Sequence, residues 1–346
     1  MQLLLIGAGS WGTTWIDMIE QAPDWELAGL VDVDPSALAR AGEMAGLPAE
    51  LRFTDLGDAL SRVPADAALV AVPPALHARV ASAVLEAGLH CLVEKPLAAT
   101  LAEAIEMVRK ADEAGRTLMV SQHYRYARGA LALQRLVRDE AIGAIGAISI
   151  RFFRQAQAEG FRRELDEPLL LDMAVHHFDQ LRGTIGFEPA RVWATSSNPI
   201  WSGFRGNANA WAALESESGA TAWYAGSWSG RGLETSWSGE WEIHGEGGAI
   251  VWDGEDRIAL IPVQKQLRAR VARRLGREWK GRRIALGPVV PPERVQVLAE
   301  FAGALREGRE PETSGWDNLR SIAVAFAAIT SARTHQPVEI ELPERR

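Results

Sequence analysis

The sequence predicts an α/β protein with two different sheets. Over residues 1–121, apolar strand-like runs alternate with helical segments, which is the pattern of a doubly wound parallel sheet covered by helices. A glycine-rich turn directly follows the first of these strands. From about residue 125 onward, alternating runs separated by Gly, Ser and Asn replace this pattern. They predict a second, α+β part with a large, open and mostly antiparallel sheet.

The length and composition set limits on what the protein can be. The chain has 346 residues, more than one hydrophobic core usually supports, and we expect two domains, residues 1–121 and 122–346. The hydrophobic fraction of 47% and the charged fraction of 24% are ordinary for a globular protein. The net charge of −8 argues against nucleic acid or an anionic membrane as the partner.

Three further observations bear on the location of the protein. No apolar run reaches the roughly 18 residues that a membrane span needs. The N-terminus enters a strand without a basic segment or a cleavage site. The single cysteine, Cys91, cannot form an internal disulfide. We therefore expect a cytoplasmic protein.

The first strand, residues 2–6, leads into the glycine turn, and a helix is expected from Thr13. The turn has the spacing G-x-G-x-x-G of a dinucleotide-binding Rossmann domain. In such a turn the first glycine permits the bend, the second lets the backbone approach a pyrophosphate, and the third lets the helix pack on the strand. The helix N-terminus offers free N–H groups to the phosphates. The predicted cofactor contacts in this turn are Gly7, Gly9, Ser10, Trp11 and Gly12.

The second strand, residues 26–32, ends in Asp32, which lies 20 residues after Gly12. At this position a carboxylate accepts hydrogen bonds from the ribose hydroxyls of the cofactor. No Arg or Lys stands beside Asp32, and Asp34 would repel a 2′-phosphate. We therefore predict NAD as the cofactor in preference to NADP. The alternative is that Asp32 is a turn acid before the helix that starts at Pro35.

The later strands of the first domain are expected at residues 51–53, 68–72, 89–93 and 117–120, with helices such as 35–45 and 75–87 between them. Ligands of doubly wound sheets collect outside the carboxyl ends of the strands. Pro73 and His77 follow one strand end, and we predict cofactor contacts for them. A lone histidine at a helix start is, however, more often structural.

Glu94 and Lys95 stand at the end of strand 89–93 and are followed by Pro96. They face the same edge of the sheet, so both are predicted cofactor contacts. Lys95 could hydrogen-bond the nicotinamide ribose and a substrate hydroxyl, and its charge would ease deprotonation of that hydroxyl. The alternative is a surface salt bridge beside a turn.

The second domain is expected to contain helices and strands of a different order. The expected helices are 130–138, 169–185, 292–307 and 316–335, and the expected strands are 147–154, 191–196, 208–215, 221–228, 236–244, 257–262 and 338–342. The basic stretch 265–283 is interpreted as a solvated surface segment, because the chain as a whole is acidic.

Helix 169–185 carries a candidate acid–base group. Asp172, His176 and Asp179 fall on one helical face. A neighbouring carboxylate fixes the tautomer of a histidine and stabilises its charged form, which suits a general base. A metal site that includes His177 is less favoured, because adjacent helical residues point about 100° apart; we expect no metal. By residue type alone, an ion pair without a catalytic role is the favoured alternative.

Taken together, these motifs resemble the Gfo/Idh/MocA oxidoreductase family over nearly the whole chain. The matching segments are Gly7 to Gly12, Asp32, Pro73 to His77, Ala87 to Pro96, Tyr124 to Tyr126, Leu171 to His176, Ser314 to Asp317 and Ser331 to Val338. The resemblance implies a Rossmann domain, a C-terminal domain with an open sheet, and a homodimer or homotetramer formed through that sheet. It also implies hydride transfer between NAD(P) and a sugar, inositol or related polyol.

The resemblance further implies roles for individual residues. Lys95, Asp172 and His176 match the catalytic positions, with His176 as the base, Lys95 orienting the hydroxyl and Asp172 positioning the substrate. The family often has Gly where this chain has Ala174, and we expect the extra methyl group to narrow the approach to the site. The family also often ends the late helix with Gly near the position of His335.

The substrate pocket is less well defined by the sequence. We expect Arg125, Arg154 and His177 to contact the substrate. Trp201, Trp228 and Trp237 are candidate sugar-stacking faces, although sheet packing or an oligomer contact explains them equally well.

The resulting interpretation is an NAD-dependent sugar or polyol dehydrogenase. One alternative is a tightly bound NAD that is recycled in a glycoside-modifying or epimerising reaction. Another is a non-enzymatic sensor of NAD or a sugar, against which the presence of Lys95, Asp172 and His176 argues.

Overall fold

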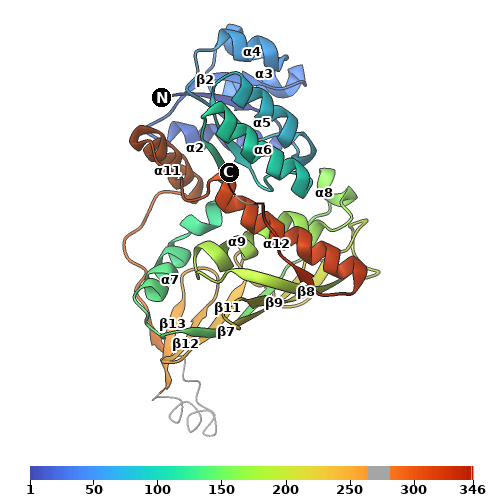
Figure 1. Cartoon of the computed structure of the whole chain (residues 1–346). Coiled ribbons are helices and arrows are strands. Elements are labelled where there is room, and N and C mark those ends of the chain that lie inside the picture. The colour runs from blue at the N-terminus through green and yellow to red at the C-terminus, as the bar shows by residue number, and fades with distance from the viewer. Residues whose placement is uncertain (264–280, 344, 346) are drawn as a thin grey trace. The chain divides into compact units, whose positions relative to one another are not determined.

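The computed structural model describes residues 1–263, 281–343 and 345, and the chain forms two compact units (Figure 1). The first unit comprises Met1–His123, Pro291–Ile322 and Pro343–Arg346. The second unit comprises Tyr124–Val290 and Ala323–Leu342. The first unit thus includes a late segment that the expected domain limits of 1–121 and 122–346 assign to the second domain.

The first unit is built on a parallel sheet of six strands in the order β3-β2-β1-β4-β5-β6. All neighbouring strands are parallel, and the order reverses between β1 and β4. This is the predicted doubly wound sheet. The strands are β1 (Gln2–Ile6), β2 (Glu26–Val31), β3 (Arg52–Phe53), β4 (Ala67–Val70), β5 (His90–Glu94) and β6 (Leu118–Ser121). Residues on both faces are buried, as helices on both sides require.

The helices of the first unit begin and end at local signals. Asp34 caps the helix that starts at Pro35 by accepting a hydrogen bond from the amide of Ser36, and Thr100 caps a later helix through Glu103. The helices are α1 (Ser10–Thr13), α2 (Ile16–Glu20), α3 (Pro35–Met44), α4 (Leu56–Arg62), α5 (His77–Glu86), α6 (Leu101–Ala114) and α11 (Glu293–Glu307). The helix expected after the glycine turn is therefore interrupted at Thr14 and Trp15.

The late segment joins the first unit through specific contacts. The indole of Trp25 donates a hydrogen bond to the carbonyl of Leu298 on α11 (2.8 Å) and stacks on Phe301 with ring centroids 5.4 Å apart. The amide of Val120 at β6 donates to the carbonyl of Thr313. Trp25 and Leu298 are 273 residues apart in the sequence, and Val120 and Thr313 are 193 residues apart. No local pattern predicts such contacts.

The second unit contains a sheet of nine strands in the order β14-β13-β12-β11-β7-β10-β9-β8-β15. Only the pair β7 and β10 is parallel among its paired strands, so the predicted mostly antiparallel sheet is confirmed. The strands are β7 (Ile145–Phe153), β8 (Pro189–Ser197), β9 (Asn209–Ser216), β10 (Thr221–Ser227), β11 (Glu240–Gly245), β12 (Gly248–Trp252), β13 (Ile258–Pro262), β14 (Arg282–Arg283) and β15 (Val338–Glu339).

Three differences from the expected elements appear in this sheet. Strands β12 and β14 were not expected, and β11 begins at Glu240 rather than at residue 236. Gly239, directly before β11, has a φ angle of 76°, and Gly248, the first residue of β12, has a φ angle of 149°. Glycine adopts such positive angles readily, and a tight turn joins the two strands. Most of the expected basic segment 265–283 lies outside the described residues.

Helices cover one face of this sheet (Figure 1). They are α7 (Arg128–Arg138), α9 (Val175–Gly183) and the second half of α12 (Gly315–Thr334), while α8 (Gly160–Glu164) is a short helix in the β7–β8 connection. The core between sheet and helices includes Phe152, Phe178, Tyr224 and Val324. The expected helix 169–185 is not uniform, since Leu169–Ala174 forms a π-helix that passes into α9.

None of the helices in the described part of the chain combines the length and the apolar character that a bilayer crossing needs.

Candidate active site

The glycine turn has the geometry of a phosphate cradle. Gly7 has a φ angle of +100°, and a Cβ atom there would lie 2.7 Å from the carbonyl oxygen of Ala71. A Cβ atom at Gly12 would lie 1.9 Å from the carbonyl oxygen of Gly7. A Cβ atom at Gly9 would meet nothing within 4 Å. The fold itself therefore requires the first and third glycines, whereas Gly9 keeps a bare backbone open to a ligand, as a bound pyrophosphate requires.

Asp32 lies beside this turn at the end of β2. Its carboxylate accepts hydrogen bonds from the amides of Ala8 (2.6 Å) and Asp34 (2.9 Å). The side chain is half-buried, and each carboxylate oxygen has a second lone pair for a further donor. The arrangement fits an acid that accepts hydrogen bonds from ribose hydroxyls while it fixes the turn.

His77 is buried under the neighbouring loops. Its Nδ1 lies 2.8 Å from the carbonyl oxygen of Pro96, and its Nε2 lies 2.9 Å from that of Val72. Burial lowers the pKa of the ring, although both carbonyls act in the opposite direction. His77 therefore links the loop after β4 to the loop after β5. Because both ring nitrogens are used in this link, the contacts argue against the predicted direct contact of His77 with the cofactor. Pro73 precedes the short 3₁₀ turn that leads to His77.

Glu94 anchors the end of β5. It accepts hydrogen bonds from the indole of Trp15 (2.9 Å) and from the amide of Lys95 (3.1 Å), and it is almost fully buried. Burial raises the pKa of this carboxyl, whereas the hydrogen bond from Trp11 and the charge of Lys95 lower it. Lys95 is half-buried, and its peptide bond to Pro96 is cis. Glu94 therefore supports the backbone from which Lys95 extends.

Two residues of this region were missed by the sequence analysis. Arg294 on α11 contacts Trp11, Trp15 and Thr14. His123 is half-buried, and desolvation, followed by the charges of Lys95 and Arg294, lowers its pKa to about 3, so its ring is neutral. Neither residue belongs to a local motif, and no pattern in the sequence points to them.

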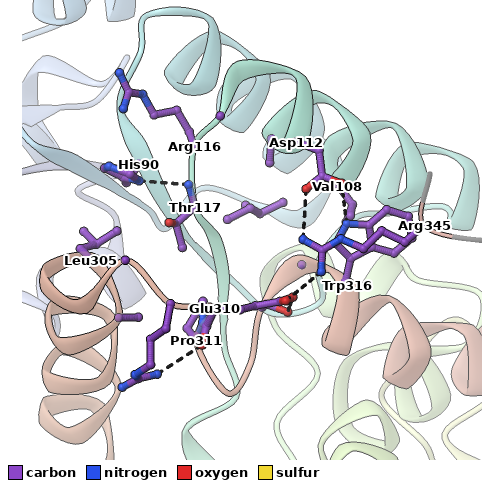
Figure 2. Close-up of a pocket in the computed structure, with 18 residues that line it drawn as sticks. His90, Val108, Asp112, Arg116, Thr117, Leu305, Glu310, Pro311, Trp316 and Arg345 are labelled. Atoms are coloured by element: carbon purple, nitrogen blue, oxygen red, sulfur yellow. Dashed lines mark hydrogen bonds and ion pairs between the residues drawn. The ribbon is translucent and has the colours of Figure 1, made fainter.

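A pocket of about 390 Å³ lies at the other end of the same sheet (Figure 2). It contains His90 and Thr117, which stand at the amino ends of β5 and β6. Asp112 accepts a hydrogen bond from the indole of Trp316 (2.8 Å) and pairs with Arg345 (3.5 Å). Because the glycine turn and Lys95 lie at the carboxyl ends of the strands, this pocket is not the candidate active site.

In the second unit, Asp172 lies in the π-helix and is buried. Its Oδ2 accepts a hydrogen bond from Nε of Arg162, a residue of α8, at 2.7 Å. A π-helix widens the backbone locally and often occurs at functional sites. Arg162 was not among the predicted residues, because nothing in its local sequence distinguishes it from Arg163.

His176 is buried next to Tyr124. The two rings are stacked, with centroids 4.3 Å apart and planes 13° from parallel. Asp179, which was expected on the same helical face, forms a buried ion pair with Arg125 through two hydrogen bonds of 2.6 and 2.7 Å. The carboxylates of Asp172 and Asp179 are thus both engaged by arginines, and Tyr124 is the ring that fixes the plane of His176.

The predicted substrate contacts have other partners in this unit. Both His177 nitrogens are engaged, by the Tyr224 hydroxyl (3.2 Å) and the Trp237 carbonyl (3.0 Å), and burial lowers its pKa to about 4. Arg125 is held by Asp179. Arg154 donates to the carbonyl of Thr235, pairs with Glu234 and covers the ring of Trp237 at 4.5 Å. These placements argue against substrate contacts of His177 and Arg125 in particular.

The three tryptophans considered as sugar-stacking faces differ in exposure. Trp228 is buried and stacks on Phe204 at 5.4 Å, which makes it a core residue. Trp237 lies under Arg154, whereas Trp201 is half-exposed and lies under Arg231. Among the described residues, no three His, Cys, Asp or Glu side chains are grouped as a metal site would need.

Comparison with known proteins agrees with this geometry. Residues 1–122 match the model of an oxidoreductase family with an NAD-binding Rossmann fold, and residues 130–251 match the GFO/IDH/MocA C-terminal domain. A protein of Sinorhizobium fredii named uncharacterized protein y4oX is 32% identical over 98% of this chain and 96% of its own length. D-apiose dehydrogenase of Paraburkholderia graminis is 28% identical over 97% of this chain and 89% of its own length.

Among solved structures, an oxidoreductase from Agrobacterium radiobacter in complex with NAD⁺, L-tartaric acid and magnesium has the same fold. It superposes with a TM-score of 0.87 over 98% of both chains at 22% sequence identity. The two family models together cover well over half of the sequence. The chain therefore belongs to the Gfo/Idh/MocA family of NAD-binding oxidoreductases.

Proposed function

We propose that the protein is an NAD-dependent dehydrogenase that transfers hydride between the nicotinamide and a ring hydroxyl or ketone of a sugar, inositol or related polyol. The observation that carries the proposal is the glycine turn, in which, of the three glycines, only Gly9 has free space where a side chain would lie. The end of β5, where the Glu94 carboxylate accepts a hydrogen bond from the amide of Lys95, lies at the same edge of the sheet. The relative named D-apiose dehydrogenase supports a sugar as the substrate. The cofactor would supply the hydride chemistry, and the protein would supply orientation and the base.

In this reaction His176 would accept the proton of the substrate hydroxyl. Its stacking on Tyr124 holds the ring in one plane, which restricts the direction from which a hydroxyl can approach. Lys95 would orient the hydroxyl and stabilise negative charge that develops on its oxygen. Asp172, neutralised by Arg162, would position a second hydroxyl of the substrate. This assignment rests on the family resemblance of the three residues.

The preference for NAD over NADP is supported by the surroundings of Asp32. The carboxylate fixes the turn through the amide of Ala8, and Asp34 lies two residues further on. A 2′-phosphate placed here would meet two negative charges. We expect NADP to bind at least tenfold more weakly than NAD, since a charge repulsion of about 1.4 kcal/mol suffices for that ratio.

We also propose that the protein forms a homodimer or homotetramer through the sheet of the second unit. On the face of this sheet away from the helices, Trp193 and Trp223 flank Ala213, and Trp211 lies on the same face of the middle strand. The three indoles are 48%, 55% and 45% exposed. An apolar surface of this kind is typical of protein interfaces. The cytoplasmic location remains a prediction from the sequence.

The oligomer can be tested by light scattering after gel filtration. Trp223→Glu should reduce the measured mass to that of a smaller species, because a charge cannot be buried in the apolar contact. Ile200→Glu changes an apolar residue outside the sheet that is more exposed than Trp223, and it should leave the mass unchanged. An unchanged mass in Trp223→Glu would show that this face is not the interface.

The dehydrogenase itself is tested by NADH formation from NAD. The purified protein is assayed with inositols, aldoses, sugar acids and glycosides, and Lys95→Ala serves as the blank. A signal that disappears in this variant would establish both the activity and the substrate class. If NAD binds but no substrate produces NADH, the proposed dehydrogenase is wrong. A bound nucleotide released on denaturation would then favour the recycled cofactor, and its absence would favour the sensor.

A further inference from the structure

Arg294, near the start of α11, contacts the glycine turn although 280 residues separate it from Thr14. Its Nη1 donates a hydrogen bond of 2.6 Å to the hydroxyl of Thr14, and that hydroxyl donates in turn to the carbonyl of Trp11 at 2.6 Å. The guanidinium also lies over the rings of Trp11 and Trp15, at 5.0 and 5.1 Å from their centroids. One side chain thus contacts Trp11 in the turn and Thr14 and Trp15 directly after it.

The turn lacks the support that a longer helix would give it. Helix α1 has only four residues and ends before Thr14, and α2 starts again at Ile16. Helical turns this short are not stable by themselves. Trp15 is fully buried and is fixed by its hydrogen bond to Glu94, whereas Trp11 is 41% exposed. Glu94 accepts hydrogen bonds from both Trp11 and Trp15, and Arg294 adds a second connection by lying over both rings.

The guanidinium is well suited to this connection. It is planar and always charged, its donors lie in one plane, and it stacks on aromatic faces. The same contacts lead on to Lys95, because the Glu94 carboxylate that fixes Trp15 also accepts the amide of Lys95. Arg294, Trp15, Glu94 and Lys95 form a continuous line of contacts behind the cofactor turn.

We propose that Arg294 is a positioning residue for NAD, which holds the glycine turn and Trp11 in the shape that binds the diphosphate of the dinucleotide. The segment that begins at residue 291 is in this view part of the cofactor site. The inference rests on NAD binding at the glycine turn, and it is independent of which substrate the enzyme uses.

The proposal is tested by titrating the full-length protein with NADH and following the fluorescence of the nicotinamide. Arg294→Ala should raise the Kd for NADH about tenfold, the usual effect of losing a hydrogen bond to a charged group. In the assay with substrate, the KM for NAD should rise while kcat at saturating NAD stays within about threefold of the wild type. Arg294→Lys keeps the charge but not the planar group and should recover only part of the affinity.

Arg306→Ala is the matched control. Arg306 also lies on α11 and pairs with Asp24, just before β2, at 2.6 Å, but it is exposed and has no contact with the turn among the described interactions. Its removal should leave the Kd within about twofold. If Arg294→Ala and Arg306→Ala weaken NADH equally, or if neither does, Arg294 does not position the turn. Failure of the wild type to bind NADH would instead contradict the proposed function.

A second measurement covers the case in which Arg294→Ala folds poorly. Thr14→Val removes the hydroxyl link and leaves both ring contacts, and it should raise the Kd by a smaller factor. A double-mutant cycle combines Arg294→Ala with Trp11→Ala. The Kd for NADH should rise less in the double variant than the two single-variant factors multiplied together, because both substitutions remove the same contact. Independent, multiplicative effects would overturn the proposal.

Discussion

The carboxylate of Asp32 accepts a hydrogen bond of 2.6 Å from the backbone amide of Ala8. The acid at the end of β2 thus fixes the glycine turn, and in the proposed function it also accepts hydrogen bonds from the cofactor ribose. If Asp32 has both roles, one residue should influence both cofactor affinity and the shape of the turn, which leads to a first prediction.

Asp32→Ala should weaken NAD binding far more than it changes kcat at saturating NAD. The variant loses the acceptor for the ribose hydroxyls and the contact with Ala8, but no group that moves a proton. Isothermal titration with NAD measures the effect, and Asp34→Ala is the control, because it removes the cap of α3 and a nearby charge but leaves the Asp32 carboxylate in place. An unchanged affinity in Asp32→Ala would mean that Asp32 does not hold the ribose.

Lys95→Ala and His176→Ala should each reduce kcat by roughly 10²-fold or more, the usual cost of a lost acid–base group. Binding of NADH to His176→Ala should stay close to the wild type, since this residue is proposed to act on the substrate. Steady-state kinetics with the substrate found in the panel provide the measurement. A near-normal kcat in either variant would remove that residue from the mechanism.

Arg162→Ala should reduce kcat/KM about tenfold or more, because the buried Asp172 loses a hydrogen bond from a charged group. Arg163→Ala changes the neighbouring exposed arginine of α8 and should have little effect. The comparison is made at several substrate concentrations, with NAD saturating. Equal kinetics for the two variants would show that Arg162 does not contribute to the site.

The buried His177 predicts a loss of stability in acid. Burial lowers its pKa from 6.5 to about 4 in the folded protein, so between these values the unfolded chain binds more protons. The free energy of unfolding therefore rises with pH in this window and falls by up to about 3 kcal/mol as the pH drops from 6.5 to 4. Denaturant unfolding across this range should show a shallower pH dependence for His177→Gln than for the wild type; an identical dependence would contradict the prediction.

His335 follows α12 with a φ angle of +57°, a left-handed conformation that side chains other than glycine adopt at a cost. His335→Gly should raise the free energy of unfolding by roughly 0.5 kcal/mol, after the greater flexibility of glycine in the unfolded chain is included. Urea unfolding at neutral pH measures the change. A loss of stability in this variant would show that the exposed side chain of His335 has a favourable contact.

Much of the first unit could be predicted from the sequence. Each of its six strands was located to within about two residues, because a buried parallel strand is a short apolar run bounded by turn residues. The glycine turn, Asp32 and the Glu94–Lys95 pair are likewise local features. In the second unit the alternating strands were found, but β12 and the π-helix were not, since a tight glycine turn and a change of helical pitch leave little trace in periodicity.

The sequence by itself determined which strand ends carry the candidate functional residues: a glycine turn follows β1, an acid follows β2 and a lysine follows β5. Only the tertiary structure decided which side chains those residues meet. In the folded protein Arg294 lies over the ring of Trp11, Arg162 pairs with Asp172, and Arg125 pairs with Asp179. Both ring nitrogens of His177 have hydrogen-bond partners within the second unit. The physical reason is that local spacing fixes backbone conformation, whereas the pairing of charges and rings depends on packing between segments that are far apart in the chain.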